Sequence, residues 1–100
     1  MELDLIARFH VRSDEEARAK SALAEVAVPT RAEAGCLDFR ALQSLSDPGL
    51  FFIHSRWSDK AAFEAHADLS HTRRFIDVME KLADQPAEIV RTTQISPSLA

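Results

Sequence analysis

Hydrophobic and polar residues alternate along the first segment of the chain. Its apolar members occupy every second position, at Leu3, Leu5, Ala7, Phe9 and Val11. Because successive side chains of a strand point to opposite faces of a sheet, a period of two predicts a β-strand over residues 3–11. Similar patterns predict strands over 36–45, 50–57 and 87–95. The segment 50–57 is apolar on both parities, which indicates that both of its faces are covered.

Two kinds of signal divide these strands. Ser46-Asp47-Pro48-Gly49 combines residues typical of tight turns, so residues 36–45 and 50–57 are predicted to form a hairpin. Between the first two strands, Ser13 and Glu16 have capping-box spacing and predict a helix that begins near Asp14. Its predicted buried stripe is Ala19, Ala22, Leu23, Val26 and Thr30. Pro29 predicts a kink or a restart in the last turn.

Glycine and serine mark the remaining helix ends. Gly35 is predicted to end the first helix by adopting a positive φ. Ser58 is predicted to cap a second helix, and Ser70 a third, which ends before Asp84-Gln85-Pro86. The predicted buried side of the third helix is Phe75, Ile76, Val78, Met79 and Leu82. The order β-α-β-β-α-(α)-β predicts an α+β protein with the ferredoxin-like split βαβ arrangement, an antiparallel sheet with helices on one face.

Composition narrows the class of protein. One hundred residues with 46% apolar content predict a single domain over 1–100, whose tail, 95–100, either frays or crosses to a partner. A net charge of -4 argues against binding to nucleic acid, which depends on clustered Lys and Arg residues. No apolar run has the length of a membrane span, and the N-terminus lacks the pattern of an export signal, so we expect a cytoplasmic protein. The single cysteine, Cys36, excludes an internal disulfide.

Three residues of the second half are candidates for chemistry. Trp57 ends a predicted strand, where its indole could wall a pocket; its alternative role is that of a large core side chain. His66 and His71 are candidate general bases, because imidazole titrates near neutral pH; the alternative for each is a structural hydrogen bond. On one continuous helix, residues five apart are rotated by about 140°, so the two histidines are not expected to share a metal.

Other polar residues have structural alternatives that outweigh a chemical role. Arg73 and Arg74 could meet an anionic substrate, although such residues more often form a solvated helix face. His10 and His54 are expected to form a polar cluster on one sheet face together with nearby arginines. Glycine-rich phosphate loops, serine-hydrolase elbows and paired-cysteine motifs are missing from the sequence.

The stretch from Glu33 to Phe75 resembles the antibiotic biosynthesis monooxygenase family. The residues that carry the resemblance are Glu33-Ala34-Gly35-Cys36-Leu37, Asp47-Pro48, Arg56-Trp57-Ser58, Ala62-Phe63, His66, Ser70-His71 and Phe75. The resemblance implies a homodimer with a dimeric α/β-barrel. It also implies oxidation of quinols or polycyclic phenols without metal or flavin. Ser55 and Ile53 depart from relatives that carry Glu and Asn there, and Phe63 replaces a hydroxylated ring of some relatives.

The sequence and the resemblance together suggest a monooxygenase, independent of cofactors, that acts on a small electron-rich aromatic such as a quinol. The expected catalytic residues are His66 and His71, and no metal ligands are expected. The expected substrate-binding residues are Trp57, Phe63, Phe75, Ile53 and Arg73. The alternative is a module of the same fold that binds a small hydrophobic ligand or haem without turnover.

Overall fold

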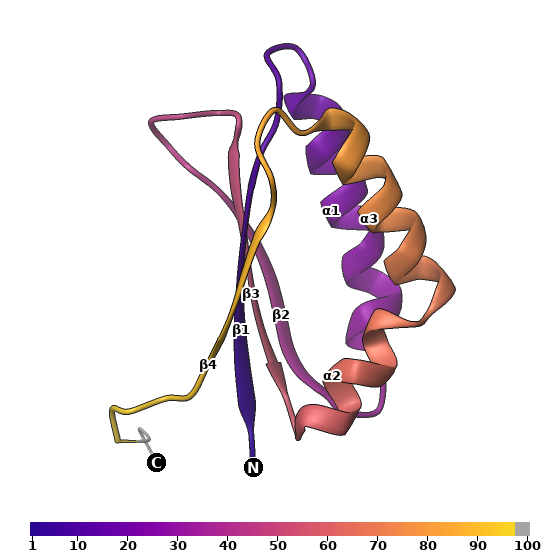
Figure 1. Cartoon of the computed structure of the whole chain (residues 1–100), viewed down its shortest axis with the longest axis vertical. Helices are drawn as coiled ribbons and strands as arrows, with labels where there is room; N and C mark the ends of the chain where they lie inside the picture. The colour runs from indigo at the N-terminus through magenta and orange to yellow at the C-terminus, as the bar shows by residue number, and fades with distance from the viewer. Residues whose placement is uncertain (98–100) are drawn as a thin grey trace.

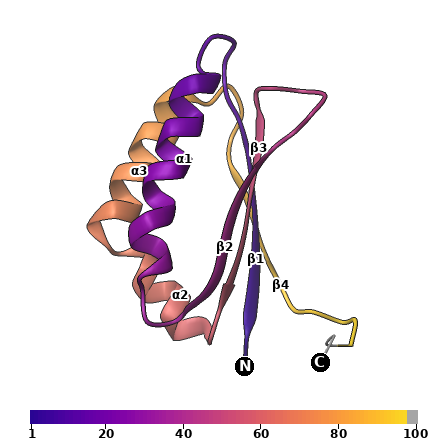
Figure 2. The same ribbon diagram turned by 180° about the vertical axis from the view of Figure 1, so that it is seen from behind.

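The computed structural model describes residues 1–97 and contains four strands and three helices in the predicted order. The elements are β1 (Leu3–His10), α1 (Glu16–Arg31), β2 (Cys36–Gln43), β3 (Leu50–Trp57), α2 (Lys60–Ala67), α3 (Ser70–Leu82) and β4 (Glu88–Thr92). The strands form one antiparallel sheet in the order β2-β3-β1-β4. Figures 1 and 2 show that all three helices lie on the same side of this sheet. The predicted ferredoxin-like α+β fold is therefore confirmed.

The alternation in β1 and β3 decides which face of the sheet the helices cover. Leu5, Ala7 and Phe9 of β1 are buried, as are Phe51 and Ile53 of β3. These side chains pack against α1 and α3, which lie side by side along the sheet (Figure 1). Residues of the other parity, such as Ile6 and Phe52, face away from the helices. Both faces of the central strands thus carry apolar side chains, but one of them has no helical cover.

The ends of several elements differ from the predicted ends. The α1 helix begins at Glu16 and no side chain caps its start, because a turn with Asp14 at φ 74° precedes it. The helix continues through Pro29 to Arg31. The strand β4 ends at Thr92 and not at residue 95 as predicted. Of the predicted tail, 95–97 lies outside the strands and 98–100 lies outside the described residues.

The start of β2 is irregular, and the predicted apolar face of α3 differs from the observed one. A bulge between Cys36 and Asp38 changes the parity at the start of β2, so that Leu37 is 49% exposed while Phe39 is buried. In α3 the buried side chains are Thr72, Phe75, Met79 and Leu82. Ile76 and Val78 are about two-fifths exposed, because they flank that stripe instead of lying on it. Within residues 1–97, no helix is long and apolar enough to cross a membrane.

Gly35 is required by a close contact and not by its backbone angle. Its φ is not positive, so the predicted reason for this glycine was wrong. A Cβ atom at position 35 would lie 2.2 Å from the Cβ atom of Ala62, in α2. The loop between α1 and β2 therefore approaches α2 more closely than would be possible with any residue other than glycine at position 35. This contact fixes the distance between Glu33, on the loop, and the short helix.

Three segments meet around His10 at the far end of the sheet. Its Nδ1 lies 2.7 Å from Oδ1 of Asp84, in the connection from α3 to β4, and its Nε2 lies 3.0 Å from Oδ2 of Asp47, in the β2–β3 turn. Both hydrogen bonds raise the pKa of His10 above its usual 6.5, and the bond to Asp84 has the larger effect. An imidazolium can donate to both carboxylates at once, whereas neutral imidazole can donate to only one.

We expect Gly35→Ala to destabilise the protein by roughly 1–3 kcal/mol, because the new methyl group must displace α2 or the loop. Denaturant unfolding of the wild-type and variant chains measures this difference. The matched control is Gly35→Ala combined with Ala62→Gly, which removes the opposing methyl group and should recover part of the loss. An unchanged unfolding midpoint in Gly35→Ala alone would contradict the close contact.

The contribution of His10 to stability should depend on pH. A folded-state pKa above the unfolded value means that protonated His10 stabilises the fold below about pH 6.5 and that this stabilisation is lost as the pH rises through the folded-state pKa. The free energy of unfolding of wild type should therefore exceed that of His10→Gln in acid, and the two should converge in alkali. A difference that is constant with pH would show that protonation is not the source.

Candidate active site

An apolar cavity of about 520 Å³ lies between the sheet and the helices. Its floor is formed by the helix-facing side chains of the strands, among them Leu5, Phe9, Phe39, Ile53 and Ile89. Its roof is formed by Phe63 and Ala67 of α2, by Thr72, Phe75 and Met79 of α3, and by the segment 83–87. Ile89 lines the cavity and is 58% exposed, which places the mouth beside β4. A pocket of this size can enclose a small organic molecule.

Polar side chains line the cavity at two places. Ser55 of β3, His66 of α2 and Thr72 of α3 lie at the end beneath α2. Glu80, Asp84 and Gln85 lie at the end where α3 leads into β4. Among the described residues, no lysine or arginine lines the cavity. The walls therefore favour an uncharged ligand that carries hydrogen-bonding groups.

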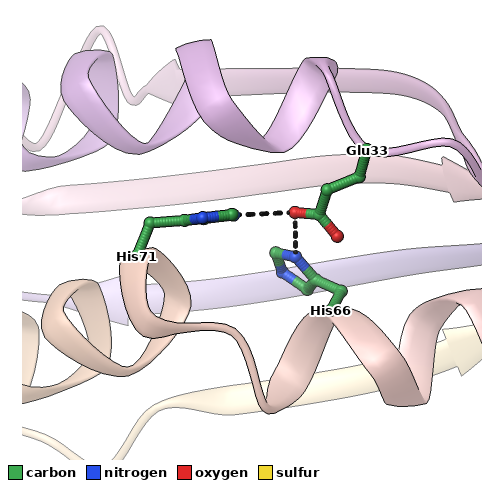
Figure 3. Close-up of side chains that lie close together, drawn as sticks. All are labelled: Glu33, His66 and His71. Atoms are coloured by element: carbon green, nitrogen blue, oxygen red, sulfur yellow. Dashed lines mark hydrogen bonds and ion pairs between the residues drawn. The ribbon is translucent and has the colours of Figure 1, made fainter.

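Glu33 connects the two histidines predicted as bases. Figure 3 shows its carboxylate between the rings of His66 and His71. One oxygen, Oε2, accepts a hydrogen bond of 2.8 Å from Nδ1 of His66 and another of 2.8 Å from Nε2 of His71. The side chains of all three residues are 12–18% exposed. These bonds orient both rings, because each fixes which ring nitrogen carries a proton.

The two histidines meet because the chain does not form one continuous helix between them. His66 lies near the end of α2 and His71 near the start of α3, and Asp68 and Leu69 separate the helices. Their ring centroids are 6.2 Å apart. The expectation that the two histidines do not share a face was therefore wrong, since it used the geometry of one continuous helix although Ser70 was predicted to begin a separate one. Of the two, only His66 is among the residues that line the cavity.

Trp57 supports the site from behind. It is 1% exposed and is not among the residues that line the cavity, in contrast to the predicted position. Its ring lies 4.6 Å from that of His66, centroid to centroid, and its Nε1 donates to Oγ of Ser55 over 3.0 Å. The indole therefore forms a rigid base beneath the imidazole, because its own polar group is already satisfied inside the core.

The other predicted substrate-binding residues divide into two groups. Phe63, Phe75 and Ile53 line the cavity. The ring of Phe63 is held between Trp57 and the guanidinium group of Arg91, whose carbon lies 5.4 Å from the ring centroid. Arg73 does not line the cavity. Its side chain is 70% exposed and its nearest acidic partner is Asp68, at 3.8 Å. It belongs to the solvated face of α3.

Three residues of the site were not predicted as functional. Glu33 belongs to the stretch that resembles the family, but its position at the end of a helix gave no sign of its partners. Thr72, whose Oγ1 lies 3.2 Å from Nδ1 of His66, is a small polar residue on an apolar helix stripe. Ser55 was noted only as a replacement of a carboxylate. A polar residue at a position where the sequence pattern predicts an apolar, buried one is the signal that could have identified Thr72 and Ser55.

Comparisons with known proteins relate the chain to one family and one fold. The sequence model of the family described as antibiotic biosynthesis monooxygenase matches residues 4–78. A protein of Bacillus subtilis (strain 168) named "Putative monooxygenase YcnE" is 27% identical over 63 residues, which are 63% of this chain and 66% of that protein. The match therefore spans less than two thirds of the relative.

Solved structures share nearly the whole fold. Rv0793 from Mycobacterium tuberculosis superposes with a TM-score of 0.91 at 22% identity, covering 98% of this chain and 99% of that one. PA3566 from Pseudomonas aeruginosa superposes with a TM-score of 0.88 at 30% identity, covering 95% of each chain. Because the family's sequence model matches most of the chain, from β1 into α3, the protein belongs to the antibiotic biosynthesis monooxygenase family.

Proposed function

We propose that the protein is a monooxygenase that oxidises a small electron-rich aromatic, such as a quinol, with His66 as the general base. The observation that carries this proposal is the position of His66, a half-buried imidazole on the wall of an apolar cavity, with Nδ1 bonded to Glu33. The family and the name of the Bacillus relative support a monooxygenase. The choice of a quinol rests on the resemblance to the family, and the apolar lining of the cavity is compatible with an aromatic ring.

Glu33 gives His66 the form that a base requires. An ionised carboxylate can only accept hydrogen bonds. Nδ1 of His66 therefore carries the hydrogen that it donates to Glu33, and Nε2 keeps its lone pair. Within residues 1–97, Nε2 of His66 has no hydrogen-bond partner, so it is free to accept a phenolic proton from a ligand in the cavity. When it does, Glu33 stabilises the imidazolium that forms. His71 donates to the same carboxylate oxygen and thereby supports Glu33 without lining the cavity.

The reaction balances without an external reductant. His66 removes a phenolic proton, and the phenolate gives one electron to O2, which yields a semiquinone radical and superoxide. The two radicals combine to form a carbon–oxygen bond, and the O–O bond then breaks. One oxygen atom stays on the ring as a hydroxyl group and the other leaves as water. The quinol itself supplies the four electrons that O2 accepts, and the product is a hydroxyquinone.

The cavity contributes by its shape and by the exclusion of water. Phe63, Phe75 and Ile53 provide flat apolar surfaces against which an aromatic ring can lie. The absence of lysine and arginine from the described lining disfavours phosphorylated or carboxylated ligands. An apolar site also shields the radical pair from water before it combines.

Replacement of His66 by Ala should reduce turnover of a responsive hydroquinone by roughly 100-fold or more, because general-base catalysis typically contributes that much. His71→Ala should have a smaller effect, since His71 acts through Glu33. Oxygen uptake by purified protein in the presence of chelator measures both, and His54→Ala, on the other face of the sheet, is the matched control. A folded His66→Ala protein with wild-type turnover would remove His66 from the mechanism.

The same assay separates an enzyme from a binding module. If no member of a hydroquinone panel supports oxygen uptake, while hydrophobic ligands or haem still quench the fluorescence of Trp57, the alternative function is favoured. Trp57 is a suitable reporter, because it is the only tryptophan and contacts both Phe63 and His66 at the cavity wall.

We further propose that the protein is a homodimer built on the uncovered face of its sheet. Ile6, Leu42 and Val90 are 43–52% exposed there, and Phe52 lies among them. They belong to four different strands, so the apolar surface extends across the whole sheet. Ion pairs border it on one side, where Arg56 meets Asp4 and Glu2. A second copy would bury this surface, and two stacked sheets would give the dimeric barrel.

Ile6→Glu should convert the dimer to a monomer, because it places a charge at the centre of the proposed interface. Sedimentation equilibrium measures the mass in solution. Val28→Glu is the matched control, since Val28 is 72% exposed on α1, away from that face. A wild-type chain that sediments as a monomer, or a dimer that Ile6→Glu leaves intact, would contradict the proposed interface.

A further inference from the structure

We infer that Glu33, His66 and His71 form a binding site for one divalent transition-metal ion, for which Zn²⁺ is the best fit. Each residue contributes one ligand atom, and the three atoms lie within 4.8 Å of one another. The carboxylate oxygen lies 2.8 Å from each imidazole nitrogen. Metal–ligand distances near 2 Å thus require only that the side chains move slightly apart around a central ion.

The backbone already holds the three ligands at one point. Glu33 comes from the loop after α1, His66 from the end of α2 and His71 from the first turn of α3, as Figure 3 shows. The contact of Gly35 with Ala62 fixes the loop against α2. Trp57 packs against the ring of His66 and restricts its rotation. A site assembled from three fixed segments loses little conformational freedom when an ion binds.

The charge at the cluster favours a cation. The side chain of Glu33 is 13% exposed, and within residues 1–97 the ion-pair partners of its carboxylate are the two imidazoles. No lysine or arginine of the described chain pairs with it. A divalent ion between the three side chains would balance this half-buried negative charge. Two imidazoles and one carboxylate suit Zn²⁺, whereas Mg²⁺ and Ca²⁺ prefer a full set of oxygen ligands.

Three protein ligands leave a fourth coordination position, and the structure indicates where it lies. Oγ1 of Thr72 is 3.2 Å from Nδ1 of His66, and both residues line the cavity. A water molecule or a ligand oxygen can therefore complete the coordination from that side. Zinc sites with three protein ligands and one open position are those that bind exchangeable ligands.

Metal binding would also change the chemistry of His66; this consequence rests on the proposed function. An imidazole coordinated through Nδ1 carries its remaining proton on Nε2. The ring would then present a donor to the cavity instead of a lone pair, and it could not accept a phenolic proton. Zn²⁺ at this site is thus expected to inhibit oxidation of a quinol.

Calorimetric titration of the chelator-treated full chain with Zn²⁺ tests the site without any substrate. We expect one ion per chain, and affinity at least about 100-fold weaker in His71→Ala and in Glu33→Gln, a larger loss than that of a residue that only supports a ligand. His54→Ala is the matched control, since His54 bonds to Asp4 on the opposite sheet face and its removal should leave the affinity unchanged.

Co²⁺ gives a second measurement on the unaltered protein. Binding at the proposed site should produce the visible absorption of a four- or five-coordinate ion without a thiolate band, because Cys36 is not a ligand. Absence of Zn²⁺ binding, a Co²⁺ spectrum like that of the free ion, or equal loss of affinity in His54→Ala and His71→Ala would overturn the inference. Failure of the proposed oxidation would show only in the oxygen-uptake assay, so the two failures are distinguishable.

Discussion

The carboxylate of Glu33 joins three parts of the chain that otherwise make few contacts with one another. The helix α2 has eight residues and buries none of them completely. A helix of this length is marginal on its own and cannot depend on an apolar stripe for its position. Its place over the sheet is set by the hydrogen bond of His66 to Glu33, by the stacking of that ring on Trp57 and by the close approach of Gly35. Polar contacts here have the role that core packing has elsewhere.

This arrangement explains why a hollow persists inside a small protein. The helices α1 and α3 pack against each other and cover the middle of the sheet, and α1 also packs on β2. The strand β4, at the other edge, is exposed along most of its length. Side chains of α3 form part of the roof of the cavity, and α2 and the connection after α3, which are held by hydrogen bonds, complete it. Apolar side chains line the space beneath without filling it.

The sequence predicted the architecture well, because strand periodicity and turn residues are local signals. The bounds of β3 and the order of all elements agree with the structure, since Pro48-Gly49 and the apolar run at residues 50–57 leave little choice. The site was predicted less completely. Ser70 predicted the start of a separate helix, but the direction of the chain at Asp68 and Leu69, which makes His66 and His71 converge, has no local signal. The partners of Glu33 come from residues 33 and 38 positions further along the chain, which no local pattern reports.

The order of strands in the sheet also has a consequence for how the chain acquires its structure. Residues 4–8 of β1 pair with 88–92 of β4, so the sheet joins segments that lie far apart in the sequence. Contacts between such distant residues form only after the intervening chain has been brought together, which slows folding. During synthesis, β1 emerges from the ribosome before β4 and pairs with it only after β4 has been translated. Until then one edge of β1 stays unpaired, and an unpaired strand edge is a site at which aggregation can begin.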